Sequence, residues 1–354
     1  MKAKILAIII ITVLALSLSG LATAQGPQLP FTLEQPSAPH SLLSWKPEFG
    51  RPFGQLPSPL TSSSEKRWGL TLSTAKVVMA AQQLPKVEPV GQIGGATYAI
   101  AAQDNYAYIG VGPRLVIVNI ADPLHPALVG QTNPLPGLVE DVAISGSYAY
   151  VASYDSGLHI VDISDPAHPA EAGYYDTPGF ALGVTVAGNY AYIADQNSLR
   201  IVNISNPANP AEVGYYDTPG WAFDVVVSGN YAYIADGNSG LRIVNISNPA
   251  NPTEVGYYDT PGWAYGVVVS GNYAYVADRD SGLRIVNISN PANPAEVGYY
   301  DTPGWAYGVV VSGNYAYVAD RDSGLRIVNI SNPANPAEVG YYDTPGWAYG
   351  VVVS

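Results

Sequence analysis

An acidic turn recurs in this sequence, and the two aspartates within it are spaced so that they could bind a cation. The stretch from Asp278 to Gly282 (Asp-Arg-Asp-Ser-Gly) returns 42 residues later, beginning at Asp320. Paired carboxylate oxygens suit a hard cation such as Ca²⁺, but the later acidic ligands of a calcium loop are missing and other copies break the pattern. Asp and Gly are also common in hairpin turns that hold no metal. We therefore predict no metal site here.

Tryptophan recurs at the same interval, close to these turns. The four residues are Trp221, Trp263, Trp305 and Trp347. Aromatic platforms suit sugar rings, whose C–H faces stack on them, so a glycan ligand is chemically sensible. Earlier copies hold other apolar residues at this position, namely Ala96, Leu138 and Phe180, a drift that is typical of packing. Packing and ligand contact both remain open. The candidate ligand-binding residues are Trp221, Trp263, Trp305, Trp347, Asp278, Arg279, Asp280, Asp320, Arg321 and Asp322.

The remaining titratable residues show no catalytic arrangement by their spacing. The histidines, which are His40, His125, His159 and His168, have no metal-ligand spacing, so neither a zinc site nor a catalytic triad is expected. Four glutamates recur at one repeat position: Glu212, Glu254, Glu296 and Glu338. A glycosidase needs two carboxyl groups in different environments, whereas copies of one residue share one environment. The chain has no cysteine, which excludes thiolate nucleophiles and disulfides. We predict a protein without enzyme activity or cofactor.

These side chains belong to a repeat of about 42 residues. Trp263–Gly304 and Trp305–Gly346 are identical, and Tyr-Ala-Tyr begins at 106, 148, 190, 231, 273 and 315. A fixed period of this length indicates a repeat architecture. Four segments of one copy are rich in Val, Ile and Tyr and are separated by turn residues, which predicts four short strands. The predicted strands are Ala264–Ser270, Tyr273–Asp278, Leu283–Ile288 and Ala295–Asp301.

The strands carry apolar residues on both faces, as Val-Val-Val and Ile-Val-Asn-Ile show. Both faces of each meander must therefore be covered, and the predicted fold is an all-β β-propeller of four-stranded antiparallel blades. A parallel β-helix is the alternative, although one coil would need fewer residues. Six complete copies, a strand-like piece at Pro89–Gln92 and a first strand near Ser354 suggest about seven blades, with the last one incomplete and the chain truncated.

Consecutive turns of an antiparallel meander alternate between its two ends. The turn with Asp278, Arg279 and Asp280 therefore shares a face with the corner after the fourth strand, which holds Asp301 and Trp305. The Ser-Gly-Asn turns and the Asn-Pro-rich turns lie on the opposite face. If a ligand binds, we expect it on the face with the tryptophans.

The rest of the chain indicates the cellular location of the repeats. Residues 1–24 predict a secretory signal, with Lys2 and Lys4, an apolar run and an Ala-Thr-Ala cleavage site; an uncleaved membrane anchor is the alternative. Residues 25–86 read as a Pro-rich, largely disordered spacer, and residues 87–354 as the repeats, with copies starting near 96, 138, 180, 221, 263, 305 and 347. From Val87 onward 25 acidic residues face 7 arginines and no lysine, a charge that disfavours nucleic acid. We expect a secreted or cell-surface protein without membrane insertion once the signal is cleaved.

One string of the repeat also carries a family resemblance. Leu-Arg-Ile-Val-Asn-Ile-Ser, with variants at Leu115–Ala121 and Leu158–Ser164, is followed by a Pro-x-Asn/His-Pro pattern. This resembles the LVIVD repeat of bacterial and archaeal cell-surface proteins, from about Val87 to Ser354. The resemblance implies a surface-exposed or secreted propeller-like module without established catalytic residues. The family's third-strand Asp survives only as Asp162 and is Asn in the other copies.

The function predicted from these observations is a non-catalytic extracellular binding or adhesion module with a glycan or protein ligand. One alternative is a structural component of the cell envelope, in which the repeats build a rigid spacer. A second is a propeller enzyme that acts on polysaccharide. The sequence does not indicate an oligomeric state.

Overall fold

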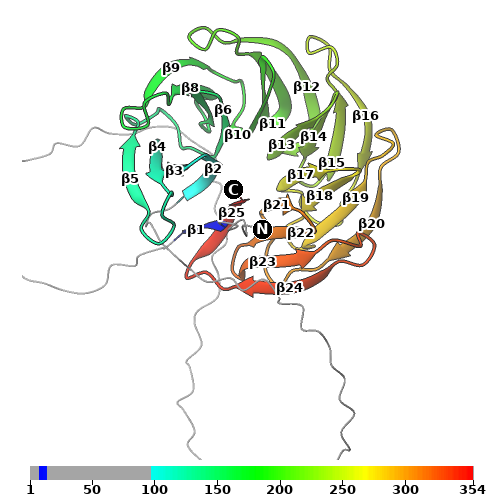
Figure 1. Ribbon diagram of the computed structural model, residues 1–354. Coiled ribbons are helices and arrows are strands. Elements are labelled where there is room, and N and C mark those ends of the chain that lie inside the picture. Colours follow the sequence, from blue (N-terminus) through cyan, green and yellow to red (C-terminus); the bar gives the residue numbers. More distant parts are fainter. Residues whose placement is uncertain (1–7, 14–96, 354) are drawn as a thin grey trace, which may run out of the picture. The chain divides into compact units, whose positions relative to one another are not determined.

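The computed structural model describes residues 8–13 and 97–353, which form 25 β-strands. The predicted spacer, the piece at Pro89–Gln92 and most of the predicted signal lie outside these residues. Within the described ranges, no helix is long and apolar enough to cross a membrane. Figure 1 shows the strands as a ring of blades.

Each complete repeat forms one antiparallel blade whose strands follow chain order. The first two blades are β2 (Thr97–Gln103), β3 (Tyr106–Val111), β4 (Arg114–Asn119) and β5 (Ala127–Gln131), then β6 (Asp141–Ser145), β7 (Tyr148–Ala152), β8 (Leu158–Asp162) and β9 (Ala170–Tyr175). The fourth is β13 (Asp224–Ser228), β14 (Tyr231–Ala235), β15 (Leu241–Asn245) and β16 (Thr253–Tyr258). The fifth and sixth are β17 (Gly266–Ser270), β18 (Tyr273–Ala277), β19 (Leu283–Asn287) and β20 (Ala295–Tyr300), then β21 (Gly308–Ser312), β22 (Tyr315–Asp320), β23 (Gly324–Asn329) and β24 (Ala337–Tyr342). The four strands predicted for one copy are confirmed.

The third blade departs from this pattern because its repeat is one residue shorter. It contains β10 (Ala181–Ala187), β11 (Tyr190–Asn203) and β12 (Ala211–Ala222). The turn between its two middle segments lacks the glycine found at Gly240 in the next copy. As a result the two segments run together in β11, which pairs with both β10 and β12.

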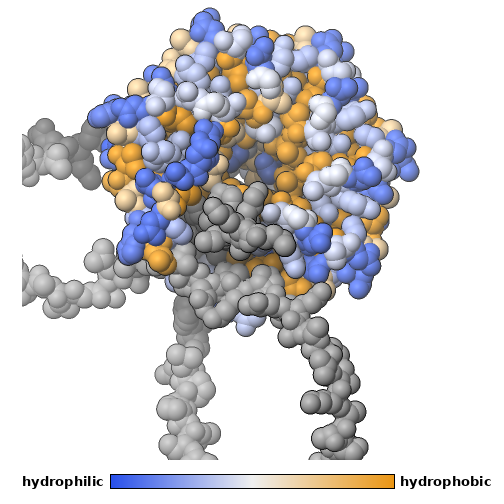
Figure 2. Space-filling view, in the orientation of Figure 1, coloured by the Kyte–Doolittle hydropathy of each residue, from blue (hydrophilic) through white to orange (hydrophobic). Residues whose placement is uncertain are grey.

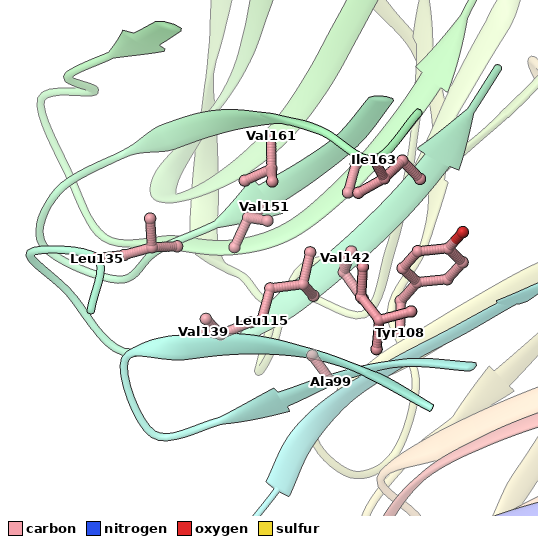
Figure 3. Packing of buried hydrophobic residues seen from close by; sticks show 11 residues of the cluster. Ala99, Tyr108, Leu115, Leu135, Val139, Val142, Val151, Val161 and Ile163 are labelled. Atoms are coloured by element: carbon pink, nitrogen blue, oxygen red, sulfur yellow. The ribbon is translucent and has the colours of Figure 1, made fainter. Parts of the chain in front are cut away.

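The hydrophobic core is divided among the spaces between neighbouring blades. Between the fourth and fifth blades, Tyr233, Leu241 and Ile243 pack against Val267 and Val276. Figure 3 shows the corresponding cluster between the first two blades. The second to fifth blades therefore bury both faces against their neighbours, as the apolar pattern predicted, and the sixth packs one face against Val351 and Val353 of the seventh copy. The facing surface in Figure 2 mixes hydrophobic and hydrophilic residues around the ring.

A β-bulge in the outermost strand brings each of the first five blades close to a loop of the next one. In β20 the register shifts between the partners of Ile285 and Val286, which pair with Gly298 and Glu296. A Cβ at Gly298 would lie 2.2 Å from the carbonyl oxygen of Pro333 in the following Asn-Pro loop. Only glycine permits this approach without a backbone shift.

The structure has six blades, so the expectation of about seven is corrected. The reason is that only six copies supply a full set of strands. The seventh copy supplies β25 (Trp347–Val353), which contacts β21 and β2 and therefore lies between the sixth and first blades. β25 pairs with β1 (Ile8–Val13), a segment inside the predicted secretory signal.

Candidate functional site

The turn after each second strand meets the corner that opens the next blade, on one face of the ring. Arg279 forms an isolated antiparallel bridge with Ala306, and Arg321 forms one with Ala348. The Gly304 N–H donates a 2.8 Å hydrogen bond to Asp320 Oδ2. The tryptophan corners and the acidic turns thus share a face, as predicted. We call this the Trp face, defined by Trp221, Trp263, Trp305 and Trp347 with the adjoining Asp-Arg-Asp turns.

The first aspartate of each turn lies inside the protein and not on the Trp face. Asp278 is 0% exposed; it accepts hydrogen bonds from the Thr260 hydroxyl at 2.5 Å and the Gly262 N–H at 2.8 Å. Asp320 makes the same contacts with Thr302 and Gly304. Burial raises the pKa of both carboxyl groups. Of the predicted acidic ligands, only Asp280 and Asp322 are therefore exposed.

A buried arginine on the third strand completes this network. The Arg284 guanidinium lies 3.8 Å from Asp278, 3.8 Å from Glu296 and 3.3 Å from Asp301, under the ring of Tyr299 at 4.5 Å. Glu296 also accepts a 3.3 Å hydrogen bond from the Tyr258 hydroxyl of the preceding blade. The repeated glutamates thus hold neighbouring blades together in equivalent surroundings.

On the Trp face itself, tryptophan and arginine alternate. The centre of the Arg279 guanidinium lies 4.0 Å from the centroid of the Trp305 ring and 5.9 Å from that of Trp263. The Arg321 guanidinium lies 4.6 Å from Trp305 and 3.9 Å from Trp347. Cation–π contacts of this kind orient both partners. We call these five residues the Trp–Arg ladder.

The backbone at the two ladder arginines is strained. Arg279 has φ of 40° and Arg321 has φ of 21°, in the left-handed region that side chains other than glycine rarely adopt. The fourth blade makes the same bridge with Gly237, at φ of 53°. The turn therefore does not require an arginine. In the second blade the equivalent Tyr154 stacks on Phe180, with centroids 4.3 Å apart.

Inside the tryptophans lies a row of aromatic rings that sequence reasoning missed. Phe223, Tyr265, Tyr307, Tyr349 and Tyr98 follow one another with centroid separations of 4.3, 4.6, 5.0 and 5.2 Å. They occupy the third position of the Trp-Ala-Tyr corner, next to the innermost strands. The row joins the ladder through Trp347, whose ring is 6.3 Å from that of Tyr349. The recurrence of Tyr two residues after Trp was the available signal.

The second and fourth blades replace part of this corner by carboxyl groups. Glu140 stands where the fifth blade has Tyr265, and Asp141 and Asp224 stand where it has Gly266. Asp141 accepts a 2.8 Å hydrogen bond from the Val184 N–H, and Asp224 accepts one of 2.8 Å from the Val267 N–H. Burial raises the pKa of all three, and the charge of Asp224 raises that of Asp141 further. Unlike the repeated glutamates, these carboxyl groups occur in only some of the copies.

The second blade also aligns a serine, a histidine and a glutamate. His159 Nε2 lies 3.1 Å from Ser156 Oγ, and His159 Nδ1 lies 2.9 Å from Glu171 Oε1. His159 is 2% exposed and takes the place of the buried arginine of other blades. Spacing along the chain did not reveal this line, because Glu171 comes from the neighbouring strand.

The surroundings of Ser156 differ from those of the other blades in a second way. In the third to sixth blades a corner glycine donates its N–H to an aspartate. In the second blade that aspartate is replaced by Ser153, whose buried Oγ has no hydrogen-bond partner. Among the described residues no hydrogen bond is formed by the Gly137 N–H, and a Cβ at Gly137 would lie 2.7 Å from Ser156 Oγ.

The other histidines make local contacts. His125 and His168 are exposed and bond to Asp122 and Asp165 three residues earlier, each at 2.8 Å. His40 lies outside the described residues. In the described ranges no group of three or more His, Asp or Glu side chains is placed to hold a metal ion.

Sequence comparison now identifies the repeat. The model of the LVIVD repeat matches residues 94–133, 136–177, 178–218, 219–260, 261–302 and 303–344. The chain belongs to the LVIVD repeat family. These six matches coincide with the six blades. No curated protein matches the chain.

Solved structures similar to this LVIVD repeat protein share its fold at low identity. A periplasmic gluconolactonase of Pseudomonas aeruginosa has a TM-score of 0.65 and 13% identity, over 75% of this chain and 91% of that one. A functionally unknown protein of Desulfotomaculum acetoxidans has a TM-score of 0.58 and 18% identity, over 70% and 84%. The Cps50 (Swd1) β-propeller domain of Myceliophteria thermophila has a TM-score of 0.54 and 11% identity, over 65% and 81%. At these identities the likeness concerns the propeller alone.

Proposed function

We propose that this LVIVD repeat protein is an extracellular binding module and that its Trp face binds a glycan. The observation that carries the proposal is the Trp–Arg ladder. Trp263 and Trp347 are 39% and 43% exposed although they are among the largest apolar side chains of the chain. Trp221, at 47%, extends the same series. Exposed aromatic groups of this size, gathered on one face, are typical of interaction sites.

The arrangement favours a sugar over a flat apolar partner. Stacking on arginine holds the indole rings in fixed orientations, which lowers the entropy lost when a ligand binds. An indole ring offers an apolar face to sugar C–H groups, and the neighbouring guanidinium and carboxyl groups offer hydrogen bonds to hydroxyls. The tandem copies repeat this combination along the face, which suits a polymer with its own repeat.

The test is a binding assay with soluble polysaccharides and the full chain. Trp305→Ala removes the central ring of the ladder, and we expect it to weaken glycan binding at least ten-fold while the thermal unfolding temperature changes little. Tyr299→Ala is a matched control, because Tyr299 is also exposed, at 52%, and stacks on an arginine, but lies on the outermost strand. If both variants bind as the unchanged protein does, the Trp face is not the site.

A second candidate function, hydrolysis of ester groups on a polysaccharide, is favoured by the line of Ser156, His159 and Glu171. With its proton on Nδ1, His159 can accept the Ser156 proton at Nε2 while Glu171 orients the ring. The Ser156 oxygen would bond to the ester carbonyl carbon, and His159 would pass the proton to the leaving alcohol. Water would then release the acid and restore Ser156. The Gly137 N–H, which forms no hydrogen bond among the described residues, is the available donor beside Ser156.

This second function is tested by release of acetate from an acetylated polysaccharide. Ser156→Ala should abolish the release. His159→Arg restores the residue that other blades carry, so the blade should fold and yet be inactive. Ser156 also donates a 2.8 Å hydrogen bond to the Ser153 carbonyl, and the hydroxyl must leave this bond to react. Equal acetate release by the unchanged protein and both variants, or none by any of them, would refute an esterase.

A further inference from the structure

The ladder arginines differ from the other repeat arginines in the carboxylates around them. Arg284 has three carboxylates within 4 Å, and its equivalents Arg242 and Arg326 do as well. Arg279 has one, Asp280, at 3.9 Å. No carboxylate among the described residues lies that close to Arg321. The two ladder guanidinium groups are therefore the arginines with the least internal charge compensation in blades four to six.

Stacking between indole rings leaves the hydrogen-bonding capacity of these arginines in place. A guanidinium is planar; the rings cover its faces, while its five N–H donors lie in its plane. The Nε of both Arg279 and Arg321 is buried without a hydrogen-bond partner, as is that of Arg284, so the donors open to a ligand are the terminal guanidinium nitrogens. Only part of the donor set is used inside the protein. Such a group can donate two parallel hydrogen bonds to a carboxylate.

Neither arginine is needed to build the turn. The fourth blade forms the turn with Gly237, and the third has Gln196 at the same position, at φ of 56°. Placing an arginine there costs left-handed backbone strain, which glycine avoids. Strain that the fold does not require is a mark of a functional position. An arginine adopts this conformation in the two copies in which it has a tryptophan on either side.

We infer that the ligand of the Trp face is an acidic polysaccharide, with uronate carboxylates on Arg279 and Arg321 and sugar rings against Trp263 and Trp347. This inference rests on the proposed glycan binding and names its chemical class. The arginines on either side of Trp305 cover its ring, so sugar rings stack on the outer rings Trp263 and Trp347, which are 39% and 43% exposed. A carboxylate beside them would accept hydrogen bonds from the terminal guanidinium nitrogens.

The net acidic charge of the repeats opposes the binding of any polyanion, as it does for nucleic acid, and the exposed carboxylates beside the ladder add to this repulsion. Asp280 and Asp322 are exposed beside the ladder. Removing the charge of Asp280 by Asp280→Asn should therefore tighten binding of an acidic glycan, by roughly two- to five-fold at low salt, because one repulsive and competing carboxylate is lost. The same change should not tighten the binding of a neutral glycan.

The experiment compares one polymer in two charge states, polygalacturonate and its methyl ester, against the full chain. We expect tighter binding of the acid form by at least ten-fold. Arg279→Gly with Arg321→Gly copies the natural turn of the fourth blade, and Arg279→Gln with Arg321→Gln copies the third. Both double variants should fold and lose the preference for the acid form, so that the acid and the methyl ester bind with equal affinity.

The outcomes separate the two levels of the proposal. If the double variants keep the full preference for polygalacturonate, or if the methyl ester binds as tightly as the acid, the arginines do not select an acidic ligand, although glycan binding stands. If neither form binds while another polysaccharide does, the inferred acidic class is wrong and glycan binding stands. If Trp305→Ala changes no affinity, glycan binding on this face fails and the inference fails with it.

Discussion

Substitution of Asp278 by Ala distinguishes a structural aspartate from a ligand-binding one. The carboxylate accepts hydrogen bonds from the Thr260 hydroxyl and the Gly262 N–H, and lies 3.8 Å from the buried Arg284 guanidinium. Hydrogen bonds to a charged group contribute about 1.5–3 kcal/mol each, and breaking a buried ion pair costs about 3–5 kcal/mol. These terms overlap, and Arg284 retains two other carboxylates. We therefore expect a loss of about 3–4 kcal/mol of unfolding free energy.

For a domain of this size, about 1 kcal/mol shifts the unfolding midpoint by roughly 2–4 °C, so Asp278→Ala should lower it by about 6–16 °C. The assay is thermal unfolding followed by circular dichroism, together with glycan binding below the transition. Asp280→Ala, two residues away and exposed, is the control, and its midpoint should move by little. An unchanged midpoint for Asp278→Ala with lost glycan binding would refute the reasoning and return Asp278 to the ligand site.

Three further predictions test the packing between blades. Gly298→Ala should destabilise the protein by about 2–3 kcal/mol, measured by chemical denaturation, because the added Cβ would meet the Pro333 carbonyl. The control is Gly271→Ala, where the added Cβ has open space but the backbone has φ of 59°; it should cost only about 1 kcal/mol. Tyr258→Phe should lower the free energy of unfolding by about 1 kcal/mol, because the Glu296 carboxylate loses a hydrogen-bond donor from the neighbouring blade. If Tyr258→Phe has the same effect in a protein that already carries Glu296→Ala, this hydrogen bond is not the cause. Burial raises the pKa of Asp236 to about 6, so the folded state binds more protons than the unfolded state between about pH 4 and pH 6, and this group's contribution to stability falls as pH rises through that window. The stability of Asp236→Asn relative to the unchanged protein should therefore increase from about pH 4 to about pH 7 in thermal unfolding; a constant difference would show that the carboxyl is not perturbed.

Much of the fold follows from the sequence because the repeat states the same local information six times. The strand bounds within a copy, the burial of both faces and the shared face of tryptophans and acidic turns all depend on periodicity and turn chemistry, which are local. The number of blades does not follow from such local information. It depends on which strands the seventh copy finds as partners, and β25 pairs with β1 from the far end of the chain. Pairing between distant segments leaves no periodic signal.

The candidate site was predictable only in part, for a similar reason. The tryptophans and Arg279 were found because they repeat. Asp278 was expected beside them on the Trp face, but it points into the blade, where Thr260 and Gly262 of the preceding corner enclose it. Alternation along a strand fixes a side chain's face, but the end of a strand is where alternation stops. The carboxyl groups Asp141 and Asp224 were missed because they break the repeat.

The identity of neighbouring copies has a direct consequence for the Trp–Arg ladder. Arg279 lies between the tryptophan of its own copy, Trp263, and that of the next, Trp305, and Arg321 lies between Trp305 and Trp347. Each stacked arginine–tryptophan pair of the ladder (a rung) therefore needs an arginine from one copy and a tryptophan from the following one. One isolated copy cannot form it, and each added identical copy adds one more rung at the same spacing. The fourth blade shows the limit, since Gly237 leaves Trp221 and Trp263 without an arginine between them. Tandem duplication is thus a poor way to build a catalytic centre, which needs unlike groups. It is a direct way to lengthen a surface proposed to bind a polymer with its own repeat.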